Sequence, residues 1–246
     1  MTAHDRLHSA ARAAREGRYA DALDEFIWFH RHALAEDPAL GAVRRTFALS
    51  YWVQLGRDYP EALRALERIR EDSENAVLHG DGGRDAFRDV AAINEYLGTG
   101  SATYQLYLAL AHSRPDVAKA CARDAVPAIV EAKDYQLARA ILPPAETLIR
   151  REAEWLNDAA QKLKLIPYTD APRRWAYVRM FVKEVSRQLT VLAGNGEISE
   201  AVRLKALAMQ LIQSPSMRKA VQAEFVKPSK APASRIERRM RRKRRS

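Results

Sequence analysis

Apolar residues recur along the chain at the three- and four-residue spacing of amphipathic helices. Over 19–36 they place Leu23, Phe26 and Ile27 on or near one face, and Asp37-Pro38 ends the pattern because the residue before a proline avoids the α region. No alternating run is long enough to indicate a strand, so the chain is predicted to be all-α. Helices are expected over 4–15, 19–36, 40–55, 59–72, 84–97, 102–113, 115–132, 134–142, 145–164, 172–192 and 197–213, with a short one after Pro215.

One short motif recurs at the expected breaks between helices. GRYADAL at 17–23 returns as GRDYPEAL at 56–63 with one residue added, and the two tyrosines lie 40 residues apart. GEISEAV at 196–202 is a copy without the tyrosine, and KDYQLA at 133–138 is a weaker one. A glycine or polar residue allows the tight turn, the aromatic closes the end of the hairpin, and the alanine lies where two helices touch. The motif therefore predicts antiparallel helical hairpins.

The stretch 49–70 shows how such a hairpin is expected to pack. Leu49 stands beside Ser50, and Ala62 stands among larger apolar residues after the break at Gly56. Two helices approach closely only where small side chains let their backbones come together. Ala62, and Ala22 at the same place in the first copy, are therefore expected to be buried at helix contacts.

The Gly-x-Tyr-x-x-Ala turn, together with Asp37-Pro38 at the end of the first copy, resembles the tetratricopeptide repeat. The period is longer and less regular than that family's roughly 34 residues. Glu74 stands where the second copy would have its closing proline, and Pro143 cuts the fourth copy short. The resemblance is closest over 1–72, with weaker echoes over 172–215. It implies hairpins stacked as an α-solenoid over 1–226; the alternative is an unrelated helical bundle with accidental echoes.

The resemblance also implies that the first helix of each hairpin lines a concave surface that contacts a protein or peptide. If Leu49 and Ser50 face the partner helix, one stripe of the 40–55 helix remains for the groove, at spacings i, i+3, i+7 and i+10. An arginine, two aromatics and an amide suit peptide binding. The alternative places Phe47 and Tyr51 in the core. The predicted groove residues are Arg44, Phe47, Tyr51 and Gln54.

The charge of the chain is concentrated at its C-terminal end. The net charge is +10, and 227–246 hold ten Lys or Arg residues against Glu237, which leaves about +1 for 1–226. Because adjacent like charges repel, this basic tail is expected to be disordered alone. Arginine forks bind phosphate in a bidentate manner, so RNA or DNA is a candidate ligand. The predicted polyanion-binding residues are Arg235, Arg238, Arg239, Arg241, Arg242, Lys243, Arg244 and Arg245.

Other uses of the tail stay open. An acidic protein, an anionic membrane surface, or solubility alone would each suit a run of arginines. No aromatic residue is interleaved among these charges, so base stacking and sequence readout are not indicated.

Few residues in the sequence indicate catalysis or metal binding. His4 and His8 have the i, i+4 spacing that can share a metal ion, but no further ligand pattern lies nearby, so both are expected to be surface residues. Cys121 has no evident base and is expected in the core. No nucleophile elbow, zinc signature or paired-carboxylate motif is present. No cofactor or metal is expected, and an enzyme stays an alternative only through a site assembled from distant residues.

These features predict a non-enzymatic adaptor or scaffold module that binds a protein or peptide in a helical-repeat groove. The alternative is a nucleic-acid-associated protein anchored by its tail. No run approaches the roughly 18 apolar residues of a membrane span. The N-terminal segment has no apolar core of a signal peptide, and a single cysteine suits a reducing compartment, so a cytoplasmic location is expected.

Overall fold

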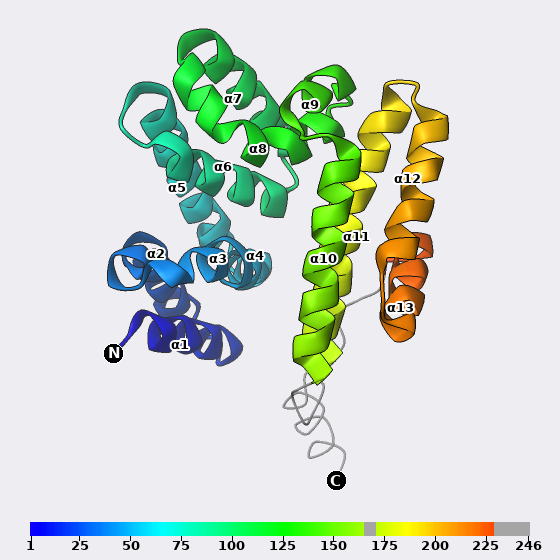
Figure 1. Ribbon diagram of the computed structural model, residues 1–246. Coiled ribbons are helices and arrows are strands. Elements are labelled where there is room, and N and C mark those ends of the chain that lie inside the picture. Colours follow the sequence, from blue (N-terminus) through cyan, green and yellow to red (C-terminus); the bar gives the residue numbers. More distant parts are fainter. Residues whose placement is uncertain (165–170, 229–246) are drawn as a thin grey trace. The chain divides into compact units, whose positions relative to one another are not determined.

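The computed structural model describes residues 1–164 and 171–228, and within them the chain forms helices joined by turns, without a strand (Figure 1). The all-α prediction is confirmed. None of the described helices is long and apolar enough to cross a bilayer. In chain order the elements are α1 (Ala3–Arg15), α2 (Tyr19–Glu36), the 3₁₀ turn η1 (Pro38–Leu40), α3 (Gly41–Val43), the π-helical segment η2 (Arg44–Ala48), α4 (Leu49–Asp58), α5 (Pro60–His79), α6 (Gly83–Leu97), α7 (Gly100–Ser113), α8 (Pro115–Glu131), α9 (Tyr135–Ile141), α10 (Ala145–Lys164), α11 (Ala171–Gly194), α12 (Ile198–Leu211) and α13 (Pro215–Val226).

The helices divide into two compact units, Met1–Ala132 and Lys133–Ser246. In the first unit, α1 packs on α2, α4 on α5, α5 on α6, and α7 on α8, while α6 also packs on α8. In the second, α11 is the central helix and contacts α9, α10, α12 and α13. Sequential pairwise packing of helices is thus confirmed.

The first hairpin turns at Gly17 as its motif predicts. Gly17 has φ +77°, a left-handed conformation that favours glycine because a Cβ would crowd the following carbonyl. The N–H of Arg18 donates to the carbonyl of Ala13 at 3.0 Å and closes the end of α1. Tyr19 then begins α2. The chain therefore reverses within three residues, and α1 and α2 pack along each other.

The second copy of the motif turns differently because of its added residue. Gly56 lies inside α4, where an added Cβ would overlap the side chain of Leu63 on α5. Tyr59 is extended at φ −138°, and Pro60 occupies the first turn of α5. In this copy the glycine allows α4 and α5 to pack closely, and it does not adopt the left-handed conformation.

The weaker copies keep the left-handed position of the first. Gly196 has φ +85°, and Lys133 has φ +62° at the place of the glycine. The N–H of Glu197 donates to the carbonyl of Leu192 at 2.9 Å, which matches the bond at Arg18. A non-glycine residue in this conformation costs on the order of 1–2 kcal/mol.

The tyrosines and the alanines of the first two motif copies lie at helix contacts of the first unit. The rings of Tyr19 and Tyr59 stack with centroids 6.1 Å apart. The indole N–H of Trp52 donates to the carbonyl of Ala62 at 2.7 Å. Ala22 and Ala62 are both fully buried, as predicted. Small residues therefore do mark the close helix contacts of both hairpins.

The second unit has a separate apolar core formed by α10–α13. Ile149, Leu156, Phe181, Val185 and Leu204 have at most 1% of their surface exposed. These residues recur at helical spacing, so one face of each helix is apolar and turns inward.

Two expectations for the first unit are wrong in detail. α5 continues past residue 72 to His79, because the fully buried Val77 anchors its last turns despite the polar residues before it. Ser50, expected against the partner helix, is exposed, whereas the neighbouring Leu49 is buried. Tertiary burial decides both positions where local sequence pattern does not.

Replacing Ala22 by leucine should destabilise the protein, because extra methyl groups at a filled helix contact force backbone shifts. Overpacking of this kind costs about 1–3 kcal/mol. The matched control is Ala20→Leu, two residues away on the exposed side of α2. Urea unfolding of both variants measures the difference, and equal stability of the two would contradict the assigned contact.

Candidate partner-binding surface

The second hairpin begins with a helix that changes its winding. α3, η2 and α4 follow one another without a break from Gly41 to Asp58, and the middle five residues are π-helical. A π turn holds more residues than an α turn, because its hydrogen bonds join residues five apart. Residues three apart, such as Arg44 and Phe47, therefore do not share a face across η2 as they would in an α-helix.

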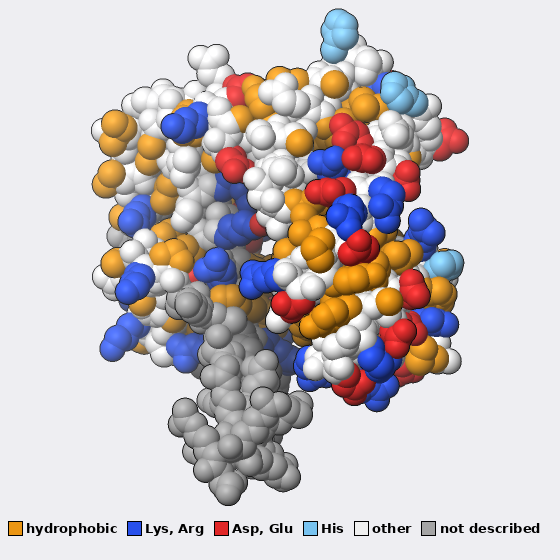
Figure 2. All heavy atoms as spheres, turned by 180° about the vertical axis from the view of Figure 1, so that it is seen from behind, with side chains coloured by type: hydrophobic (Ala, Val, Ile, Leu, Met, Phe, Trp, Pro, Cys, Tyr) orange, Lys and Arg blue, Asp and Glu red, His pale blue; other side chains and the backbone are white. Residues whose placement is uncertain are grey.

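Three of the four predicted groove residues lie on one exposed stripe. Phe47 is 64% exposed and Tyr51 is 43% exposed, with Gln54 exposed one turn further. The alternative that the two aromatics belong to the core is therefore wrong. We call Phe47, Tyr51 and Gln54 the α4 stripe. In Figure 2, apolar side chains gather on the first helices of the chain, bordered by charges of both signs.

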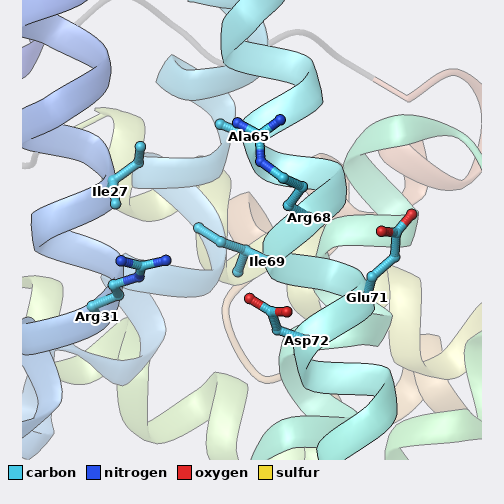
Figure 3. A pocket seen from close by; sticks show the side chains of 7 residues that line it. All are labelled: Ile27, Arg31, Ala65, Arg68, Ile69, Glu71 and Asp72. Atoms are coloured by element: carbon cyan, nitrogen blue, oxygen red, sulfur yellow. The ribbon is translucent and has the colours of Figure 1, made fainter.

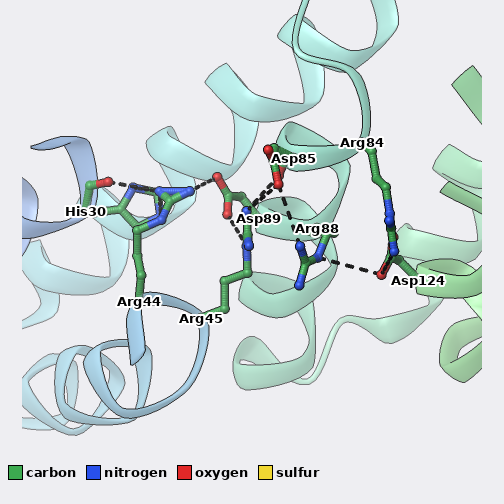
Figure 4. A network of polar contacts seen from close by, with 8 residues as sticks. All are labelled: His30, Arg44, Arg45, Arg84, Asp85, Arg88, Asp89 and Asp124. Atoms are coloured by element: carbon green, nitrogen blue, oxygen red, sulfur yellow. Dashed lines mark hydrogen bonds and ion pairs between the residues drawn. The ribbon is translucent and has the colours of Figure 1, made fainter. Parts of the chain in front are cut away.

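Arg44 does not join the α4 stripe. It is only 6% exposed, and its guanidinium lies between His30 and Asp89 (Figure 4). The prediction assumed an unbroken α-helix over 40–55, and the π turn removes the basis for it. Arg44 is therefore a buried structural residue and not a groove residue.

Arg44 and its neighbour Arg45 share one carboxylate, that of Asp89 on α6. Arg44 donates through Nη2 to one oxygen of Asp89, and Arg45 donates through Nε to the other at 2.7 Å. All three side chains are largely buried. Nη1 of Arg44 also donates to the backbone carbonyl of His30 on α2 at 2.9 Å. The contacts join α2, η2 and α6, and we call this group the Asp89 cluster.

The Asp89 cluster continues to the surface along α6 (Figure 4). Arg45 also contacts Asp85 at 3.1 Å, and Arg88 lies 3.7 Å from both Asp85 and Asp124 of α8. Arg84 donates to Asp124 at 2.6 Å. In each of these outer pairs at least one side chain is 41% exposed or more, and ion pairs that reach solvent contribute little each. The buried inner part of the cluster is the part that matters for stability.

Burial governs the protonation of the inner residues. It lowers the pKa of His30 to about 3, with the cations of Arg44, Arg45 and Arg31 acting in the same direction. Burial likewise lowers the pKa of Arg44, against the Asp89 carboxylate, which raises it. His30 is thus neutral near pH 7, so its ring can lie 3.3 Å from a guanidinium nitrogen of Arg44 without repulsion.

A hollow of about 400 Å³ lies between α2 and α5 in the same unit (Figure 3). Ile27, Ala65 and Ile69 provide its apolar part, and Arg31 and Asp72 stand on opposite sides. Arg68 and Glu71 complete the lining. No lining side chain is a serine, cysteine or histidine, so the hollow offers no nucleophile with an imidazole base.

The other residues considered in the sequence have ordinary surroundings. His4 and His8 are exposed with their Nε2 atoms 3.0 Å apart, and no group of three or more metal-ligating side chains occurs among the described residues. Cys121 is fully buried, and burial raises the pKa of its thiol to about 11, which leaves it unreactive near neutral pH. The predicted polyanion-binding residues, Arg235 to Arg245, lie outside the described residues.

Sequence reasoning missed the acidic half of the Asp89 cluster. Asp85 and Asp89 are an i, i+4 pair, which is a visible signal of a shared helix face. Their partners, Arg44 and Arg45, lie about forty residues earlier, so the pairing depends on the tertiary fold.

No family model, curated protein or solved structure matches the chain.

Removing the carboxylate of Asp89 should destabilise the first unit strongly. Asp89→Ala leaves Arg44 and Arg45 buried without their counter-ion, and breaking a buried pair in this way costs about 3–5 kcal/mol. Asp85→Ala is the matched control, since its side chain is 78% exposed and such pairs contribute about 0–1 kcal/mol. Urea unfolding should separate the two variants. Similar losses would mean that the inner pair is not the main support.

Stability should fall on acidification in a way that depends on His30. Below its ordinary pKa of 6.5 the unfolded chain takes up a proton at His30, while the folded protein does not until pH about 3. His30 therefore contributes stability that is complete above pH 6.5 and is lost as pH falls toward 3, with a slope of at most about 1.4 kcal/mol per pH unit. Unfolding free energies of the wild type and His30→Gln across this range should diverge in slope. Parallel curves would contradict the buried neutral state.

Proposed function

We propose that the chain is a non-enzymatic protein-interaction module whose α4 stripe binds a peptide segment of a partner protein. Phe47 and Tyr51 are the observation that carries the proposal. Among the described residues no other Phe, Tyr or Trp is as exposed, and the two lie four residues apart where η2 runs into α4. In this proposal, the helical hairpins stack as a tetratricopeptide-like solenoid over 1–226, and α4 is the first helix of its repeat.

Aromatic side chains suit this role for energetic reasons. Each presents about 150–250 Å² of surface, and tyrosine adds a hydroxyl group for hydrogen bonding. A few buried aromatics dominate the binding energy of most interfaces. Phe47, near the end of the π-helical segment, and Tyr51, in the first turn of α4, are four residues apart and both exposed, so one partner segment could contact both.

Polar groups at the end of the α4 stripe favour an acidic partner. Gln54 offers an amide, and Arg57 follows on the next turn. Arg57 is exposed and makes no ion pair with any described residue, unlike many arginines of this unit. A peptide with an apolar anchor for Phe47 and Tyr51 and a carboxylate for Arg57 would use all of these groups.

The opposite face of the helix makes the surface rigid. Leu49, Trp52 and Leu55 are buried, and Trp52 is fixed by its hydrogen bond to Ala62. The helix end preceding the stripe is held by the Asp89 cluster. A preorganised surface loses less entropy on binding, which favours α4 as a binding element.

Peptides selected from a random display library against the full chain provide the test. Replacing both aromatics, as Phe47→Ser with Tyr51→Ser, should weaken binding of the selected peptides by roughly 30-fold or more, since loss of a hot spot costs about 2 kcal/mol. Unfolding free energy should stay within about 0.5 kcal/mol of wild type because both side chains are exposed. The Kd is measured by fluorescence anisotropy.

Leu108→Ser is the matched control, because Leu108 is an exposed apolar residue of α7 in the same unit. It should leave the Kd unchanged. Peptides that bind wild type and the double variant equally would contradict the α4 stripe as the site. A large loss of unfolding free energy in the double variant would mean that Phe47 and Tyr51 stabilise the fold.

A second candidate function is supported by the charge of the tail. Ten Lys or Arg residues in 227–246 give that segment nearly all of the net charge of the chain. We propose that it binds RNA or DNA through phosphate contacts and anchors the module to nucleic acid. Without interleaved aromatics, binding is expected to be independent of base sequence.

Salt dependence provides a direct test of the tail. If it neutralises about six to ten phosphates, affinity should fall on the order of 10³–10⁵ between roughly 50 and 200 mM salt through counterion release. Two oligonucleotides of unrelated sequence should bind alike, and truncation before Lys227 should abolish binding. Retained binding by the truncated chain would move the nucleic-acid site into the helical body. If the intact chain does not bind at low salt, the nucleic-acid function is contradicted, and the tail would instead bind an acidic protein or a membrane surface or serve solubility.

A further inference from the structure

The turn between α11 and α12 contains a reactive dipeptide. Asn195 is the one asparagine of the chain that is followed by glycine; the others, Asn75, Asn94 and Asn157, precede larger residues. In such a dipeptide the backbone nitrogen of the glycine can attack the asparagine side-chain carbonyl carbon, since no Cβ hinders its approach. Attack expels ammonia and forms a succinimide. Addition of water then opens the ring to aspartate or isoaspartate.

In the folded protein both reacting groups are engaged elsewhere. Nδ2 of Asn195 donates to the carbonyls of Tyr135 on α9 and Val191 on α11, each at 2.9 Å. The backbone N–H of Gly196 donates to the carbonyl of Ala193 at 3.0 Å. The attack requires the asparagine side chain to rotate and the Gly196 nitrogen to leave its partner. Local opening of the turn must therefore precede the reaction.

Asn195 also holds α9 in place. α9 has only seven residues, too few for a stable helix without tertiary support. Its first residue, Tyr135, has its ring so close to Gly194 that a Cβ there would overlap it, and its carbonyl accepts the Asn195 bond. The remaining support within the described unit includes the buried Ala138 and the pair Arg139–Glu197 at 3.7 Å.

We propose that Asn195 is a deamidation site that is protected by the α9–α11 contact and whose product releases α9. Deamidation replaces the Nδ2 donor by a carboxylate oxygen, which would face two carbonyl oxygens where two hydrogen bonds stood. A hollow of about 400 Å³ lined by Lys133, Tyr135, Gly194 and Asn195 among others brings solvent to the contact. Water for ring opening is thus at hand once the turn has opened.

The full chain, incubated in mildly alkaline buffer with and without denaturant, tests the protection. Peptide mapping by mass spectrometry follows conversion at position 195. Conversion should be at least about tenfold slower in the folded protein, since only opened molecules react. Asn75, exposed and followed by alanine, is the internal control and should react slowly in both conditions. Equal rates at Asn195 in the folded and unfolded chain would overturn the protection.

Two variants test the consequence separately from the chemistry. Asn195→Asp places the product in the chain, and Asn195→Ser removes the amide without adding charge. Hydrogen exchange of the α9 amides should accelerate by about tenfold or more in Asn195→Asp, and by less in Asn195→Ser, because only aspartate repels the carbonyls. Exchange in α13, which contacts α11 at other residues, should not change in either. Unchanged α9 exchange in Asn195→Asp would overturn the release of α9.

Discussion

Two arginines bound to one buried carboxylate fix how the first unit is assembled. Asp89 on α6 holds Arg44 and Arg45 of η2, and Arg44 reaches onward to the backbone of α2. A buried ion group of this kind costs desolvation that good geometry only just offsets, so its value lies in the arrangement it selects. Both arginines belong to the π-helical segment η2, so the cluster ties that segment to α6. The five residues of η2 precede α4 directly, so their winding sets the register in which α4 begins.

Small residues supply the second constraint, which is the short distance between helix backbones. Ala22, Ala62 and Gly56 let helix backbones approach until the Tyr19 and Tyr59 rings stack and the Trp52 indole reaches a backbone carbonyl. Packing at this density responds to single methyl groups. Apolar contact thus sets how close the helices lie, while the Asp89 cluster ties α2, η2 and α6 together at defined residues.

The sequence contains enough local signal for the helices and the hairpin turns, because apolar period, glycine and proline act within a few residues. It does not show where the number of residues per helical turn changes. The placement of Arg44 on the groove face assumed 3.6 residues per turn, and the π turn that overturns it is stabilised by Asp89, 45 residues away. The end of α5 depends on burial of Val77, which the polar residues before it do not indicate. The exposure of Tyr51 and Gln54 was predictable because both lie in the regular α4, and Phe47 lies only two residues before it.

Along most of α4, the side chains that stabilise the fold and the side chains proposed to bind a partner lie on different faces. Just before α4 the two roles fall in one short segment. Leu49, Trp52 and Leu55 face inward while Tyr51 and Gln54 face outward, so a change on one side need not disturb the other. Phe47 is different, because it belongs to the same five-residue π segment as Arg44. A change of winding in this segment would rotate Phe47 relative to Tyr51, because π and α turns differ in residues per turn. The buried charges therefore bind the segment that carries Phe47, although no charge of the inner cluster lies on the proposed binding surface.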